Sequence, residues 1–208
     1  MRLLILASLC VSLAVAADKV EKGFTSLFNG KALTGWTKAK ENEGTFVVKD
    51  GAIVANGPRC HLFYTGPVNK GDFKNFELKV DVMTQPKSNG GIYFHTAYQD
   101  TGWPAKGFEV QVNNSHGDWR KTGGLYAVQD NKEAFEDGKW LTEHIIVKDN
   151  VVTIMVDGKK TAEWTQPADW KGIDQFPDRR LTSGTIALQG HDPGSTVYYK
   201  NIRIKALK

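Results

Sequence analysis

The sequence predicts an all-β protein, a two-sheet antiparallel jelly-roll sandwich. After residue 17 the chain consists mostly of short runs in which apolar and polar residues alternate, and little of it keeps helical spacing over three turns. Dipeptides that accept a positive φ separate several of these runs, at Asp50-Gly51, Asp149-Asn150 and Asp157-Gly158. The strands are longer and the loops larger than an immunoglobulin-type sandwich needs, so a jelly roll fits better.

The longer expected strands are 75–83, 90–97, 107–114, 142–149, 151–157, 184–191 and 196–207. Two connecting segments, 115–140 and 165–184, are long enough to carry function.

Residues 1–17 have the features of a secretory signal peptide. Arg2 precedes a short apolar run, and Ala14-Val15-Ala16 gives the small-x-small cleavage pattern. We therefore expect a secreted or periplasmic protein whose single domain spans 18–208. No later segment is apolar enough to span a membrane.

Composition limits the partner classes. The chain has 208 residues, 40% hydrophobic and 24% charged, which suits one well-filled core. Its net charge of +4, about +3 without Arg2, is spread along the chain without a Lys/Arg cluster, which argues against nucleic acid. Without the leader Cys60 is the one cysteine, so no internal disulfide can form, and we interpret Cys60 beside His61 as structural.

One strand carries an unusual polar row. In 107–114, Phe108, Val110 and Val112 form an apolar row, while Glu109, Gln111 and Asn113 lie on the other face. A solvated face would more usually carry Lys, Glu and Thr, so this row indicates a recess for a polar ligand.

Two further strands place polar side chains on the same kind of face. Alternation turns Tyr93 and His95 outward in 90–97, and Gln189 and His191 outward in 184–191. If the three strands are neighbours, these side chains converge with Glu109 and Gln111 on one concave surface.

Several segments, in order, resemble the marker segments of one family: SLFNGKALTGW, NGGIYFH, GFEVQV, GGLYAV, GKWLTEHIIVKDNVVTIMVDGKKTAEW, and GTIALQGH followed by VYYKNIRI. The resemblance is to the 3-keto-disaccharide hydrolase domain family and covers about residues 23–207. It implies a concanavalin A-like, glucanase-type jelly roll. It also implies an exported enzyme that cleaves glycosides whose 3-hydroxyl a partner oxidoreductase has first oxidised.

A ketone at C3 acidifies the C2 proton, and the glycosidic oxygen at C1 is then the β leaving group. The reaction needs a base, an acceptor for the enolate charge and an acid for the leaving oxygen. We assign Glu109 as the base, with His191 and His95 as acid, electrophile or metal ligand and Gln111 and Gln189 positioning hydroxyls. The family commonly has Arg where this chain has His95.

Further substrate contacts are expected from Asn113, Tyr93 and Tyr126, from Trp119 as a sugar-stacking platform, and from Arg120 as a hydroxyl donor. Asp81, on the strand preceding 90–97, is a candidate supporting acid.

Glucanases on this fold place their acids at E-x-D-x-x-E along one strand. The corresponding stretch here, 109–114, has Gln111 and Asn114 where the second and third carboxylates would stand, which argues against double displacement.

Three alternatives stay open. His95, Glu109 and His191 could bind a divalent metal that polarises the 3-keto oxygen. The protein could instead be a lectin-like binding module without turnover, or a structural or interaction protein without any pocket.

Overall fold

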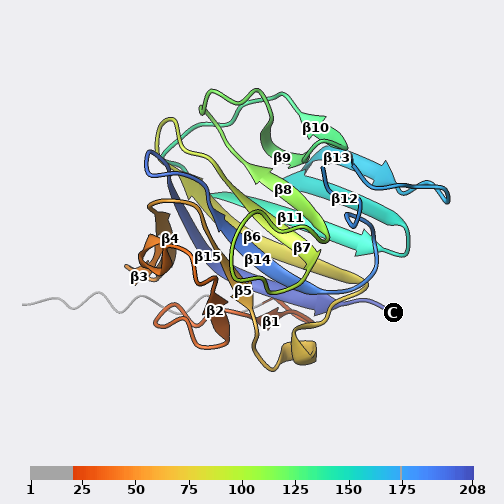
Figure 1. Cartoon of the computed structure of the whole chain (residues 1–208), viewed down its shortest axis with the longest axis horizontal. Coiled ribbons are helices and arrows are strands. Elements are labelled where there is room, and N and C mark those ends of the chain that lie inside the picture. Colours follow the sequence, from red (N-terminus) through yellow and green to blue (C-terminus); the bar gives the residue numbers. More distant parts are fainter. Residues whose placement is uncertain (1–20, 174) are drawn as a thin grey trace, which may run out of the picture.

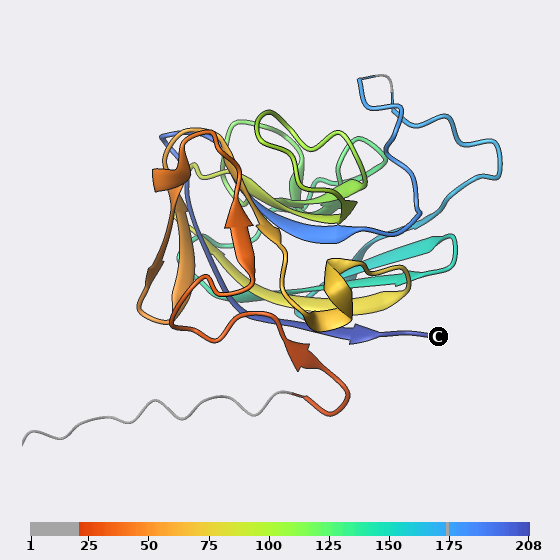
Figure 2. The same ribbon diagram turned by 60° about the horizontal axis from the view of Figure 1, so that its bottom comes forward.

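The structure, a computed structural model, describes residues 21–173 and 175–208. The proposed leader therefore lies outside the described residues. The chain folds into two stacked antiparallel sheets, seen as two layers in Figure 2. This confirms the predicted two-sheet sandwich. In the described part of the chain, no helix is both long and apolar enough to cross a membrane.

The larger sheet has eight strands in the order β13-β12-β11-β6-β15-β4-β3, with β1 paired to β15 (Figure 1). Their bounds are β1 (Thr25–Ser26), β3 (Phe46–Lys49), β4 (Ala52–Asn56), β6 (Phe76–Thr84), β11 (Leu141–Lys148), β12 (Val151–Val156), β13 (Lys159–Thr165) and β15 (Thr196–Ala206).

The smaller sheet has seven strands in the order β10-β9-β8-β7-β14-β5-β2. Their bounds are β2 (Trp36–Lys38), β5 (Cys60–Tyr64), β7 (Gly90–Thr96), β8 (Phe108–Val112), β9 (Lys121–Leu125), β10 (Gln129–Asn131) and β14 (Thr185–Gly190). Two 3-10 helices, η1 (Glu43–Thr45) and η2 (Val68–Gly71), lie in connections. Loops gather on the outer side of this sheet, above β14 in Figure 2.

The predicted turns close hairpins. Asp50 and Gly51 take φ of 50° and 78° between β3 and β4, and Asp157 and Gly158 take 47° and 79° between β12 and β13. Positive φ at both central residues matches the twist of the flanking strands. Between β11 and β12 only Asp149 has a positive φ, of 55°.

The core lies between the two sheets. Phe108, Val110 and Val112 are fully buried in it, as the alternation of β8 predicts. Cys60 is also fully buried, and burial raises the pKa of its thiol to about 11, which fits the predicted structural role.

One carboxylate lies in this apolar layer. Glu143 on β11 is fully buried, pairs with Val80 and Val156 across the sheet, and neither of its carboxylate oxygens has a hydrogen-bond partner among the described residues. Burial raises its pKa well above the usual value, against a smaller opposing effect of the Gly123 backbone, so the fold favours the neutral form of Glu143.

This state makes stability depend on pH. Because the folded pKa is above the unfolded one, the stability linked to Glu143 is complete below the unfolded pKa and declines as pH rises toward the folded pKa. Glu143→Gln removes that titration. The Tm of the variant minus the Tm of wild type is therefore expected to increase by at least about 2–4 °C between pH 5 and pH 9, which corresponds to about 1 kcal/mol of unfolding free energy.

Thermal unfolding followed by circular dichroism at several pH values measures this difference. Glu136→Gln, at an exposed site, is the matched control and should track wild type throughout. Parallel Tm-against-pH curves for wild type and Glu143→Gln would show that Glu143 is ionised in the fold.

Candidate functional site

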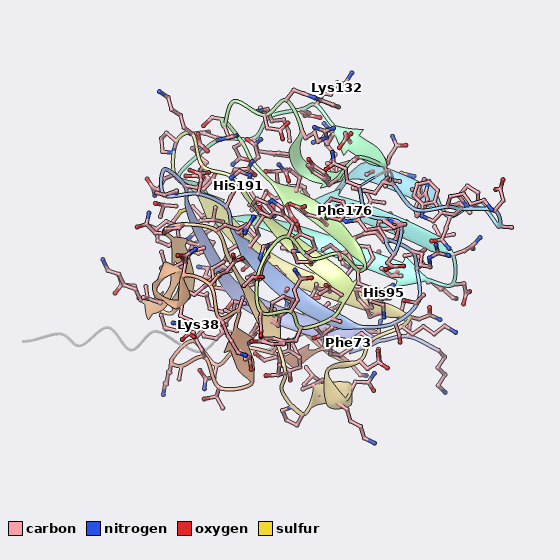
Figure 3. All side chains as sticks on the ribbon, viewed as in Figure 1. Lys38, Phe73, His95, Lys132, Phe176 and His191 are labelled. Atoms are coloured by element: carbon pink, nitrogen blue, oxygen red, sulfur yellow. The ribbon has the colours of Figure 1, made fainter. Side chains whose placement is uncertain are left out.

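A pocket of about 190 Å³ lies on the smaller sheet, between side chains of its strands and of the connecting loops. Strand side chains form its floor: Tyr93 from β7, Glu109 and Gln111 from β8, and Gln189 from β14. Side chains from the connections complete it, namely Asn89, Trp103, Asp118, Tyr126, Gln175, Phe176, Arg179 and His191. Figure 3 labels Phe176 and His191.

Strand register brings the floor residues together. Tyr93 pairs with Glu109, while Gly91 pairs with Gln111 on one side and Gln189 on the other. Because β8, β7 and β14 are neighbours, these polar side chains share one face. Gly91 leaves the space in which Glu109 lies, since a Cβ there would be 2.5 Å from Glu109 Oε1.

Glu109 is held by two donors. The Tyr93 hydroxyl donates to Oε2 at 2.6 Å, and Gln189 Nε2 donates to Oε1 at 2.9 Å. Gln189 Nε2 also lies 3.1 Å from the Tyr93 hydroxyl oxygen. Each carboxylate oxygen has two lone pairs, so Glu109 keeps the capacity to accept a proton from a ligand.

Burial shifts the pKa values of both Glu109 and Tyr93. Glu109 is 5% exposed, and burial raises the pKa of its carboxyl group, although the positive charge of Arg179 and the donors Tyr93 and Gln189 oppose the shift. Burial, with the charge of Glu109, also raises the pKa of Tyr93 well above its usual value. Tyr93 therefore stays a donor, and Glu109 is a carboxylate of increased basicity.

His191 lines the pocket just beyond the end of β14. Its Nδ1 lies 2.7 Å from Asp192 Oδ2, which also accepts from the Ser195 hydroxyl. With the proton on Nδ1 fixed by this carboxylate, Nε2 is the nitrogen left for proton exchange. The ring packs against Trp103 at 5.2 Å between centroids.

Several residues in or beside the pocket were not among the predicted site residues, and Arg179 and His61 are two of them. Arg179 comes from the 165–184 connection, which was singled out only for its length, and its side chain is 1% exposed. His61, next to Gln189 in register, is fully buried between Tyr93 and Trp103. Burial, aided by the charge of Arg59, lowers the pKa of His61 to about 3, so it is neutral.

The structure corrects the predicted position of His95. The pairing of β14 with β7 shifts register between Thr185 and Ala187, and His95 has a φ of 54°. This bulge breaks the alternation, and the ring turns toward Phe76, with Nε2 2.8 Å from the Lys74 carbonyl oxygen.

His95 also lies far from His191. Thr96, beside it, pairs with Thr185 at the start of β14, whereas His191 follows the end of that strand, roughly 20 Å away at 3.3 Å per residue. Figure 3 shows this separation. Both ring nitrogens of His95 are engaged, since Nδ1 accepts from the Thr182 amide at 3.3 Å. His95 therefore does not join Glu109 in the pocket.

Asp81 is a second correction. It lies on β6, in the larger sheet, whose neighbours are β11 and β15 rather than β7. Its carboxylate accepts from Thr142 Oγ1 at 2.9 Å and from Asn201 Nδ2 at 2.8 Å, so it links strands of that sheet.

Asn113 also has a structural position. Its amide donates to the carbonyls of Asp118 and Arg120, and its Oδ1 accepts from the His116 amide. The polar row of β8 thus contributes Glu109 and Gln111 to the pocket, while Asn113 closes the following loop.

Of the three predicted contacts in the 115–140 connection, only Tyr126 lines the pocket. The Arg120 guanidinium stacks on both Trp119 and Tyr126, 4.7 Å from each ring centroid, and forms ion pairs with Asp118 and Asp130. Arg120 therefore supports the pocket wall from behind, and Trp119, 50% exposed, lies outside the pocket lining.

The predicted metal ligands do not come together, because His95 is remote from Glu109 and His191. No group of three His, Cys, Asp or Glu side chains with ligand geometry occurs among residues 21–173 and 175–208. Glu109 and His191 alone are fewer than the three protein ligands of a catalytic zinc site.

The 3-keto-alpha-glucoside-1,2-lyase-like domain model matches residues 23–205. The chain belongs to this family. The resemblance found in the sequence segments is thereby confirmed, and with it the carbohydrate class of the family's substrates.

Similar proteins support the same family assignment. A 3-keto-disaccharide hydrolase of Bacteroides thetaiotaomicron is 25% identical over 252 residues, which cover 95% of this chain and 81% of that protein. A Parabacteroides distasonis structure, provisionally assigned as a glycosyl hydrolase, matches with a TM-score of 0.75 and 28% identity, over 89% of this chain and 94% of that one.

The fold extends beyond the family. A non-specific endo-β-1,3(4)-glucanase matches with a TM-score of 0.55 and 15% identity, over 89% of this chain and 92% of that one. The protein thus has the predicted concanavalin A-like, glucanase-type sandwich.

Proposed function

We propose that this protein is an exported enzyme that cleaves 3-keto-glycosides by base-initiated elimination followed by addition of water. Glu109 is the base. The observation that carries the proposal is a buried carboxylate of raised pKa on the pocket floor, held by Tyr93 and Gln189 and turned toward the ligand space.

The chemistry needs only one such carboxylate. Glu109 removes the C2 proton, which the C3 ketone has acidified, and the C1–oxygen bond then breaks. The other acidic residue lining the pocket, Asp118, is paired with Arg120, so a pair of facing free carboxylates is not present among the described lining residues.

His191 is placed for the second proton transfer. Asp192 holds the Nδ1 proton, and in the imidazolium form of the ring Nε2–H delivers its proton to the leaving glycosidic oxygen. Water then adds at C1, a proton returns to C2, and the net reaction is hydrolysis. Gln111 supports substrate binding, because its Nε2 donates to Asn89 at 3.0 Å while its buried Oε1 has no partner among the described residues and is left to accept from a hydroxyl.

The substrate requires a preceding oxidation, because an unoxidised sugar has no acidic C2 proton. A sugar 3-oxidoreductase is therefore the expected upstream partner. Because residues 1–17 have the features of a secretory leader, the proposal assigns this protein to the periplasm or the outside of the cell.

The test is incubation of the protein in D2O with a 3-keto-disaccharide and, separately, with its unoxidised parent, with and without EDTA. Sugar release from the keto substrate alone, with deuterium at C2 of the released keto sugar, is the expected result. The EDTA samples measure any metal requirement.

Binding of either sugar without release would instead assign the chain to the lectin class. The burial of Glu109 in a pocket, rather than on a shallow groove facing bulk water, favours catalysis over that alternative. A purely structural protein would have no such pocket.

A further inference from the structure

We propose that Arg179 receives the negative charge that develops on the C3 oxygen when the C2 proton is removed. This inference rests on the proposed function and assigns its second catalytic group, a guanidinium that binds the enolate oxygen of a 3-keto sugar.

The first observation is a buried cation that forms no ion pair among the described residues. The Arg179 side chain is 1% exposed, and within the described part of the chain it forms one hydrogen bond, from Nη2 to the Pro104 carbonyl at 3.3 Å. Nε and Nη1 are buried and have no partner among the described residues. Burying a charge without a counter-charge is costly, so an anionic ligand or transition state that reached Arg179 would recover part of this cost.

The second observation is the packing of aromatic rings around this group. The guanidinium carbon lies 4.0 Å from the ring centroid of Phe176, 5.7 Å from that of Tyr93 and 5.9 Å from that of Tyr126. These rings restrict the guanidinium and exclude water from it. At the edge of the guanidinium, Nε and Nη1 have no hydrogen-bond acceptor among the described residues. Arg179 lines the same pocket as Glu109.

The third observation is the relation of Arg179 to the base. Arg179 and Glu109 form no ion pair, and the Glu109 oxygens accept from Tyr93 and Gln189 instead. Arg179 therefore keeps its donors for a substrate oxygen, while its charge still favours an anion in the pocket.

The step balances without a further reactant. Glu109 takes the C2 proton, the C–H electron pair forms the C2–C3 double bond, and the carbonyl π pair moves to O3, where N–H groups of Arg179 donate to it. The O3 pair then restores the carbonyl, the C2–C3 pair shifts to C1–C2, and the leaving oxygen departs with a proton from the acid.

Arg179→Gln tests the assignment. With a 3-keto-disaccharide, kcat is expected to fall by about 10²–10³-fold with KM changed only a few-fold, because the contact forms mainly in the transition state. Arg180→Gln is the matched control. Arg180 is exposed in the same connection and its side chain donates to the Pro177 carbonyl, so the substitution should leave kcat within about twofold.

Arg179→Ala provides a second measurement. Added guanidinium chloride is expected to restore part of kcat in Arg179→Ala, whereas sodium chloride at the same ionic strength is not. This rescue is read against circular dichroism and Tm, so loss of fold is separated from loss of the cation.

The outcomes are distinct. Unchanged kcat in Arg179→Gln with an active wild type overturns the role of Arg179 alone. Lost binding with kcat retained also overturns it, and assigns Arg179 to a carboxylate on the ground-state substrate, as in a uronic acid. A wild type that releases no sugar from the keto substrate removes the proposed function, and the role of Arg179 with it.

Discussion

Replacing Glu109 by Gln is expected to reduce sugar release from a 3-keto-disaccharide by about 10²–10⁴-fold, the usual contribution of a general base. Gln keeps the volume of the side chain but cannot take the C2 proton. The same variant should lose deuterium incorporation at C2, measured by mass spectrometry of the keto sugar in D2O.

The control is Glu163→Gln, at an exposed site on β13 where the carboxylate pairs with Lys160. It removes a carboxylate outside the pocket and should match wild type. Retention of C2 exchange by Glu109→Gln would remove Glu109 from the role of base, even if sugar release were slowed.

The pH profile gives an independent check on the same residue. Glu109 must be deprotonated to act, so kcat/KM of wild type should rise with pH as the carboxyl ionises. Because burial raises the pKa of Glu109, that rise should occur above the range of an ordinary Glu. A limb centred at the ordinary Glu pKa would indicate a solvated carboxylate.

The sequence alone predicts which face of the sheet a side chain lies on, as long as its strand is regular. Tyr93, Glu109, Gln111 and Gln189 all lie where a period of two places them, and together they form the pocket floor. Because one face of each strand is buried, the alternation of apolar and polar residues shows which side chains face away from the core.

The sequence does not predict where a bulge interrupts the alternation of a strand, nor which of the two sheets a strand joins. The bulge at His95 inverts the side chain, and nothing in the alternation of 90–97 marks it. Asp81 was placed beside β7 because the strands are consecutive, whereas consecutive strands of a sandwich can enter opposite sheets.

Arg179 illustrates a different limit. It lies in a connection without periodicity, and its proximity to Glu109 depends on how the described residues on either side of it fold back over the sheet. A buried unpaired charge is recognisable only once burial and partners are known.

Gly91→Ala is expected to lower kcat by about 10²-fold without unfolding the protein. A Cβ at this position would lie 2.5 Å from Glu109 Oε1, 3.0 Å from its Cγ and 3.1 Å from its Cδ. The backbone of Gly91 is not in the positive-φ region, so Ala is accepted there, and the strain falls on the Glu109 side chain. Displacing the carboxylate from Tyr93 and Gln189 by about 1 Å is enough for this loss.

The Gly91 effect should act through Glu109, and a double-mutant cycle measures whether it does. In a Glu109→Gln background, Gly91→Ala should add little further loss, because the misplaced group is no longer a base. Gly44→Ala, at an exposed position where a Cβ meets nothing within 4 Å, is the matched control and should leave kcat unchanged. Fully additive losses in the cycle would mean that Gly91 serves the pocket in some way other than by making room for Glu109.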